Sequence, residues 1–192
     1  PYIEAGGVGV FIPAGTFLQP SREGQAALTA LVLKYLGDVS GKIADLFCGV
    51  GTFSYPLAQR PGCRVLAVDA SKELLEGFKN SVNRQMIANI EIVHRNLFKY
   101  PLEGAELEGL AAVVFDPPRA GAKEQAVRLA ALPAGKRPRK LIAVSCNPET
   151  FARDAEILQN GGYRLCEVTP VDQFVYTSHC ELVALFADDG LL

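Results

Sequence analysis

A cysteine and a glutamate at the ends of two apolar segments are the side chains of this chain best suited to chemistry. Cys146 lies in Ser145-Cys146-Asn147-Pro148, directly after the apolar run 140–144. A thiol at a helix N-terminus is near a dipole that favours the thiolate, although a cysteine on its own is more often a packed core residue. Glu181 opens a second apolar run, where an acid needs a partner or a purpose. Together, the two residues predict a reactive pair.

A glycine-containing turn predicts a nucleotide site. Residues 45–51 read Asp-Leu-Phe-Cys-Gly-Val-Gly between an apolar run and a short helix, and glycines there let the backbone approach a ligand. Asp69 ends the next apolar run, where an acid can accept hydrogen bonds from both ribose hydroxyls. Ser54 occupies the third glycine position of a dinucleotide motif, and no Walker lysine is present. The pattern favours a mononucleoside cofactor such as S-adenosylmethionine; the alternative is a tight turn beside a surface aspartate.

The loop Asp116-Pro117-Pro118-Arg119 follows another apolar run. Its two prolines stiffen the backbone and remove two amide donors, so the loop can present carbonyl groups and Asp116 to a flat base. Amino-directed methyltransferases have an aromatic residue after such prolines. Arg119 at that position argues against methylation of an amino group, and the remaining alternative is a rigid turn without chemistry.

Composition limits the other classes of function. The chain has 192 residues, a net charge of −2, five cysteines without a C-x-x-C motif and two histidines, which argues against a zinc site and for a reducing cytoplasm. No apolar run approaches the roughly 18 residues of a membrane span. Three cysteines are expected to be packing residues: Cys48, Cys166 and Cys180. Seven Lys or Arg residues against one acid occur between Arg119 and Lys140, which indicates either a solvated surface or a patch that contacts phosphates.

Apolar runs alternate with amphipathic segments along the chain, which predicts an α/β fold with a parallel sheet covered on both faces. The last two strands are joined by a loop alone, so we expect a hairpin whose final strand is antiparallel. Residues 1–20 are expected to be an N-terminal extended segment and 21–192 one domain. Because the chain starts at Pro1, we expect further protein upstream. Strands are predicted at 42–47, 64–68, 89–94, 111–115, 140–144, 163–169 and 181–186, and helices at 21–36, around Pro56, after Ser71, at 124–132 and at 148–160.

Taken in order, these motifs resemble those of the RNA uracil-C5 methyltransferases, which make 5-methyluridine in bacterial ribosomal and transfer RNA. The resemblance spans nearly the whole chain and is strongest at Ser145–Pro148 and at His179-x-Glu181. It implies a class I S-adenosylmethionine-dependent methyltransferase (Rossmann-like) fold with a mostly parallel seven-stranded sheet, S-adenosylmethionine as cofactor, ribosomal or transfer RNA as partner, and a β-barrel RNA-binding domain upstream. We further expect a cytoplasmic monomer without a membrane or metal partner.

The resemblance also assigns roles to individual residues. Two departures from the family pattern are Thr52, where relatives often have Asn, and Pro20 after Gln19. His179 is expected to make a structural hydrogen bond rather than orient the base. The implied cofactor-binding residues are Gln19, Phe47, Gly49, Gly51, Thr52, Asp69, Asn96 and Asp116, the substrate-binding residues are Asp116 and Arg119, and the catalytic residues are Cys146 and Glu181.

Uracil C5 becomes nucleophilic when a thiolate adds to C6, so the implied mechanism needs one thiol and one base. Cys146 would add to C6, and Glu181 would remove the C5 proton before elimination. Base flipping is required for access. Three alternatives stay open: an amino- or ribose-directed methyltransferase, a non-catalytic nucleotide-binding RNA module that tolerates Cys146→Ala, and a nicotinamide oxidoreductase, which Ser54 disfavours.

Overall fold

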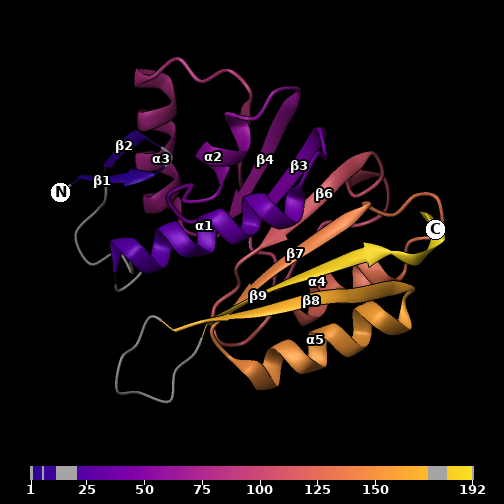
Figure 1. Ribbon diagram of the computed structural model, residues 1–192. Helices are drawn as coiled ribbons and strands as arrows, with labels where there is room; N and C mark the ends of the chain where they lie inside the picture. Colours follow the sequence, from indigo (N-terminus) through magenta and orange to yellow (C-terminus); the bar gives the residue numbers. More distant parts are fainter. Residues whose placement is uncertain (1, 6, 12–20, 173–180, 192) are drawn as a thin grey trace.

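A seven-stranded sheet forms the centre of the computed structural model, which describes residues 2–5, 7–11, 21–172 and 181–191 (Figure 1). The strand order is β5-β4-β3-β6-β7-β9-β8; all neighbours pair in parallel except β9, which is antiparallel to both β7 and β8. The predicted mostly parallel sheet with an antiparallel C-terminal strand is confirmed. The strands are β3 (Gly41–Leu46), β4 (Cys63–Asp69), β5 (Ile90–His94), β6 (Leu110–Phe115), β7 (Lys140–Ser145), β8 (Tyr163–Val171) and β9 (Glu181–Asp188).

Helices cover both faces of this sheet, as the near-continuous apolar strands predict (Figure 1). Successive strand residues point to opposite faces, so Val113 belongs to one hydrophobic core and Val114 to the other. The first core contains side chains of α1, α2 and α3, and the second contains those of α4 and α5. The helices are α1 (Arg22–Leu36), α2 (Ser54–Ala58), α3 (Lys72–Arg84), α4 (Lys123–Ala130) and α5 (Pro148–Asn160); short 3-10 turns occur at Gly104–Glu106 and Asp189–Leu191.

Side-chain caps fix where three helices begin. The Ser21 hydroxyl accepts a hydrogen bond from the Gly24 amide at 2.9 Å at the start of α1, and Ser71 does the same for α3. Asn147 caps α5 through the Glu149 amide at 3.0 Å, with Pro148 in the first turn. These caps place the first residues of α3 and α5 directly after β4 and β7, next to the predicted site.

The predicted extended segment 1–20 contains an antiparallel hairpin of β1 (Tyr2–Ala5) and β2 (Val8–Phe11). The hairpin lies against α3: Val10 is fully buried, and the Gln85 side chain donates a hydrogen bond to the Gly9 carbonyl. The remainder of the segment, including Gln19, falls outside the described residues.

Cys166 is exposed, so the prediction that it is a packing residue is wrong. It lies on the outer strand β8 where the register against β9 shifts between Leu165 and Glu167. A bulge of this kind leaves one residue unpaired and turns it away from the sheet. Cys48 is buried as predicted, and Cys180 lies outside the described residues.

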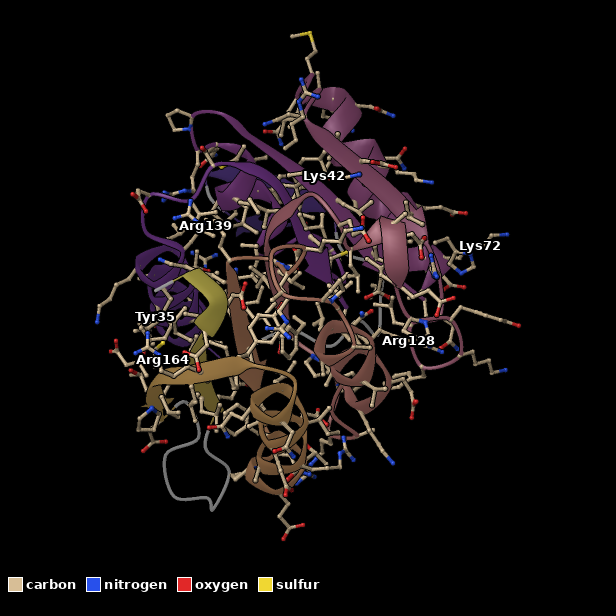
Figure 2. All side chains as sticks on the ribbon, turned by 90° about the vertical axis from the view of Figure 1, so that its right-hand side faces the viewer. Tyr35, Lys42, Lys72, Arg128, Arg139 and Arg164 are labelled. Carbon is tan, nitrogen blue, oxygen red and sulfur yellow. The ribbon has the colours of Figure 1, made fainter. Side chains whose placement is uncertain are left out.

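Among the described residues, at least four of the seven cations between Arg119 and Lys140 contact protein groups. Arg137 forms an ion pair with the buried Asp188, and the Lys140 ammonium donates to two carbonyls at the end of α1. Lys136 and Arg128 pair with Glu108 and Glu103. Figure 2 views the sheet from the side where Arg128 and Arg139 lie, near the amino ends of the parallel strands. These contacts favour a solvated surface over a phosphate-binding patch in this stretch.

Among the described helices, none combines the length and apolar character of a membrane span.

Candidate active site

One edge of the sheet collects the loops that carry the predicted site residues. The parallel strands β3 to β7 end there, and the antiparallel β9 begins there. Backbone hydrogen bonds join neighbouring loops: the Cys48 amide donates to Val68, the Arg95 amide to Asp69, and the Asp116 amide to Leu46. Every predicted site residue except Gln19 lies within the described residues, and all of these lie along this edge.

The glycine turn after β3 is open to a ligand at Gly49. Phe47 and Gly49 both have positive φ values, 61° and 55°, and a Cβ built on Gly49 would meet only Leu74, at 4.0 Å. Gly51 is required for a different reason, because a Cβ there would lie 2.5 Å from the ring of Phe78 in α3. Gly49 is therefore the glycine that leaves room for a ligand, and Gly51 permits the close approach of α3. Thr52 is half-buried in the same turn.

Asp69 holds this turn in place. Its carboxylate accepts hydrogen bonds from the Gly49 amide at 2.9 Å and from the Ser71 amide at 2.8 Å. Asp69 is predicted to be the ribose ligand, and each carboxylate oxygen has a further lone pair that can accept a hydroxyl proton. The same side chain therefore connects the glycine turn to the start of α3 and can still bind a diol.

Asp45 lies fully buried beneath the glycine turn. One of its oxygens accepts a hydrogen bond from the Ser54 hydroxyl at 2.6 Å, and the other has no hydrogen-bond partner among the described residues. Burial raises the pKa of Asp45 to about 7, against the opposing effect of the Ser54 hydrogen bond. From sequence, Ser54 only marked a missing third glycine; in the structure its hydroxyl binds the buried acid.

The loop after β5 presents an aromatic side chain toward Phe47. Asn96 accepts hydrogen bonds from the amides of Phe98 and Lys99, so its side chain shapes the turn at the predicted adenine position. The Phe98 ring packs on Phe47 with centroids 5.4 Å apart and remains 42% exposed. The sequence analysis did not single out Phe98. An aromatic residue two positions after a turn-forming Asn was the available signal.

Cys146 and Glu181 lie side by side. Ser145 at the end of β7 pairs with Leu182 of the antiparallel β9, so the next residues toward the edge, Cys146 and Glu181, adjoin. Glu181 is 4% exposed, and Cys146 is half-buried. Asp116 follows β6, which pairs with β7 on its other side. The structure therefore brings the two predicted catalytic residues and Asp116 to one place.

The electrostatic surroundings of the thiol differ from the prediction of a thiolate favoured by a helix dipole. Burial raises the pKa of Cys146, and the carboxylates of Glu181 and Asp116 raise it further, whereas the nearby Arg119 guanidinium lowers it. Burial, followed by Glu181 and Asp45, raises the pKa of Asp116 to about 8. The charged form of Asp116 is therefore disfavoured beside Glu181 and Asp45.

The profile of the tRNA (uracil-5-)-methyltransferase family matches residues 11–188. The chain belongs to this family. An uncharacterized RNA methyltransferase of Brucella melitensis is 46% identical over 186 residues, which cover 96% of the chain and 43% of the relative. The 23S rRNA (uracil(1939)-C(5))-methyltransferase RlmD of Edwardsiella ictaluri is 35% identical over 192 residues, which cover 97% of the chain and 42% of the relative. The chain thus spans less than half the length of these curated relatives.

A solved structure of a uracil-C5 methyltransferase has the same fold as this member of the tRNA (uracil-5-)-methyltransferase family. The tRNA (uracil-54, C5)-methyltransferase of Pyrococcus abyssi, in complex with S-adenosyl-L-homocysteine, superposes with a TM-score of 0.80 and 30% identity over 97% of this chain and 44% of that chain. The M. jannaschii TYW2 structure, at 12% identity over 97% of this chain and 85% of that chain, shares the fold with a TM-score of 0.69. The predicted S-adenosylmethionine-dependent methyltransferase fold is confirmed.

Two predicted features of this family member lie outside the reach of the structure, Gln19 and His179, because neither belongs to the described residues. Arg119 is exposed at the rim of the site, where its charge acts on the Cys146 thiol. Within the described residues, no group of three or more His, Cys, Asp or Glu side chains is arranged to hold a metal ion.

Proposed function

We propose that this chain is the catalytic part, within residues 21–192, of an enzyme that uses S-adenosylmethionine to form 5-methyluridine in ribosomal or transfer RNA. The observation that carries the proposal is the adjacency of Cys146 and Glu181 at the sheet edge that also holds the glycine turn. A thiol beside a carboxylate supplies the nucleophile and the base that C5 methylation of uracil requires. A cytoplasmic location and a monomeric state belong to the same proposal.

The residues around the glycine turn suit an adenosyl cofactor. Gly49 leaves its face of the turn open, Asp69 can accept hydrogen bonds from the ribose hydroxyls, and Phe98 offers an exposed ring for adenine. Asp45 adds a buried acceptor beneath the turn. Thr52 and Asn96 complete the cofactor side, and Asp116 lies between this side and the thiol. When bound, S-adenosylmethionine supplies an electrophilic methyl group.

The remaining chemistry falls to two side chains. The Cys146 thiol loses its proton, and the sulfur electron pair forms a bond to C6 of the uracil while the C5–C6 π electrons make C5 nucleophilic. Once C5 carries the methyl group, the Glu181 carboxylate takes the C5 proton. The electrons of that C–H bond re-form the C5–C6 double bond, and the thiolate leaves. The raised pKa of Cys146 means that the first proton must pass to a base at neutral pH.

RNA that contains 5-fluorouridine tests the proposal. Fluorine cannot leave as a proton, so the full-length enzyme that contains this chain is expected to form, with S-adenosylmethionine, an adduct that survives denaturing electrophoresis. Cys146→Ala should abolish this adduct, whereas Cys166→Ala, which removes the exposed thiol of β8, should leave its yield unchanged. Glu181→Gln should instead accumulate an adduct on ordinary uridine RNA. An adduct that persists in Cys146→Ala, or no adduct with the unmodified protein, contradicts the proposal.

A further inference from the structure

The first two turns of α5 face the backbone of the loop that follows β6. Asn147, Thr150 and Asp154 are spaced three and four residues apart, so they lie on one side of the helix. All three bind the backbone between residues 119 and 122. The helix that begins directly after Cys146 is therefore joined to the loop that carries Asp116 and Arg119.

The Arg119 carbonyl is held from two directions. The side-chain amide nitrogen of Asn147 donates to it at 3.1 Å, while the oxygen of the same side chain caps α5. The Thr150 hydroxyl lies 3.1 Å from the same oxygen. The Ser145 hydroxyl accepts a hydrogen bond from the backbone amide of Asn147 at 3.2 Å, which fixes the turn around the thiol itself. The backbone of Arg119 is thus tied directly to the Cys146 turn.

Asp154 holds the far end of the loop. Its side chain is 6% exposed, and one oxygen accepts a hydrogen bond from the Ala122 amide at 2.6 Å. The other oxygen pairs with Arg153, whose guanidinium also donates to the Ala120 carbonyl at 3.0 Å. A Cβ on Gly121 would lie 2.7 Å from the Asp154 carboxylate, so this approach requires glycine.

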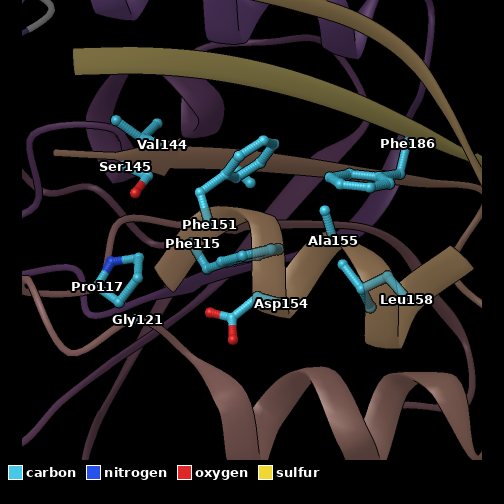
Figure 3. Close-up of a pocket in the computed structure, with 11 residues that line it drawn as sticks. Phe115, Pro117, Gly121, Val144, Ser145, Phe151, Asp154, Ala155, Leu158 and Phe186 are labelled. Atoms are coloured by element: carbon cyan, nitrogen blue, oxygen red, sulfur yellow. The ribbon is translucent and has the colours of Figure 1, made fainter. Parts of the chain in front are cut away.

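Packing between this loop, the sheet and α5 is incomplete. A small cavity lies between the loop, the sheet and α5, with Pro117, Gly121 and Asp154 on its wall (Figure 3). Phe115 and Phe151 line it as well. A void provides no contact atoms to hold the backbone above it. The hydrogen bonds from α5 therefore carry more of the loop's positioning than in a fully packed site.

We infer that Thr150 and Asp154 are positioning residues that hold the loop 116–122 against α5, and thereby keep Arg119 and Asp116 beside the Cys146 thiol. This inference rests on the proposed function for its catalytic consequence. The charge of Arg119 provides the measurable link between the loop and the thiol, because a guanidinium displaced from Cys146 no longer lowers the pKa of the thiol.

Two variants test the inference, each with its own comparison. Asp154→Asn removes the charge that holds Arg153 and weakens the acceptor for Ala122. Thr150→Val removes one hydroxyl at nearly constant volume, and Thr150→Ser restores the hydroxyl. Asp188→Asn is the matched control, because it breaks the other buried Asp–Arg pair, with Arg137, near the opposite edge of the sheet.

The first readout is the pH dependence of Cys146 alkylation by iodoacetamide, followed on its own peptide by mass spectrometry. In Asp154→Asn the midpoint should move to higher pH by about 0.3 to 0.5 units, because a partly exposed charge is screened by water and salt. Arg119→Gln gives the reference shift for complete loss of the cation. Asp188→Asn should leave the midpoint where the unmodified protein has it.

The second readout is the rate of adduct formation with 5-fluorouridine RNA at saturating S-adenosylmethionine. We expect roughly a tenfold decrease in Asp154→Asn and a smaller decrease in Thr150→Val that Thr150→Ser reverses, with the affinity for S-adenosylhomocysteine unchanged. Equal effects of Asp154→Asn and Asp188→Asn on both readouts overturn the inference, as does an unchanged alkylation midpoint in both loop variants. If Asp154→Asn does not fold, Thr150→Val decides. Absence of an adduct in the unmodified protein defeats the proposed function alone, since alkylation still measures the loop.

Discussion

At the scale of the residue, the Phe98 ring is exposed while hydrogen bonds from Arg95 hold the loop that carries it. Arg95 donates to the carbonyls of Tyr100 and Pro101 and pairs with Glu106, so the loop around Phe98 has little freedom. Because the loop already holds the exposed ring in place, little conformational entropy is lost when a ligand binds to it. Such a ring is suited to a flat heteroaromatic group.

Phe98→Ala is expected to weaken binding of S-adenosylhomocysteine about tenfold, because the loss of one stacked ring costs on the order of 1–1.5 kcal/mol. Isothermal titration calorimetry measures the change. Tyr100→Ala is the matched control, since Tyr100 is 65% exposed on the same loop and its ring has no contact with Phe47 among the described ring pairs. Equal affinities of the two variants would show that the exposed ring of Phe98 does not contact the cofactor.

The main site residues could be predicted from sequence because each follows or opens an apolar strand, and the ends of parallel strands share one edge. Cys146, Glu181 and Asp116 belong to this group. Asp154 could not be predicted as a loop contact, because its partner, the Ala122 amide, is 32 residues away and only the packing of α5 brings the two together. The raised pKa of Cys146 was missed for the same reason, since it results from burial of the thiol in the folded chain and then from the carboxylates of Glu181 and Asp116.

At the scale of the element, strand and helix boundaries follow from local signals, and irregular features do not. Ser21, Ser71 and Pro148 mark helix starts within one residue of those observed. The exposed position of Cys166 results from a bulge that only exists because β8 pairs with β9. Local propensity contains no information on that pairing.

The C-terminal end of α1 is capped by a cation from strand β7. The Lys140 ammonium at the start of β7 donates to the Tyr35 carbonyl at 2.9 Å and to the Leu36 carbonyl at 3.1 Å. Lys140→Gln should lower the free energy of unfolding by about 1–2 kcal/mol, because a charge at a helix C-terminus and two carbonyl partners are lost. Lys136→Gln, which breaks an exposed ion pair with Glu108, should cost less than about 0.5 kcal/mol. Urea unfolding of the two variants distinguishes these values, and similar losses would refute a capping role.

At the scale of the whole molecule, carboxyl groups with raised pKa values gather at the site edge. Burial is the main cause of the raised pKa of both Asp45 and Asp116; Asp45 also raises the pKa of Asp116, and Asp116 raises that of Cys146. Asp45 lies in β3 and Asp116 directly follows β6, and both of these strands contribute residues to the two hydrophobic cores. Ionisation of either group is therefore expected to lower the stability of the folded chain.

Asp45→Asn should make the protein more stable at pH 8 and leave its stability at pH 3.5 nearly unchanged. The folded-state pKa of Asp45 is raised from 3.8 to about 7, so the folded protein binds the proton more tightly than the unfolded chain. The contribution of this group is fully present below pH 4 and is lost as pH rises through 7. A neutral amide keeps an oxygen for the Ser54 hydroxyl and avoids this loss, which amounts to at most about 4 kcal/mol. Thermal unfolding between pH 3.5 and 8.5 measures the difference. Asp188→Asn, which breaks an ion pair, should instead be less stable than the unmodified protein at pH 8. A stability difference between Asp45→Asn and the unmodified protein that is constant with pH would mean that Asp45 ionises normally beneath the glycine turn.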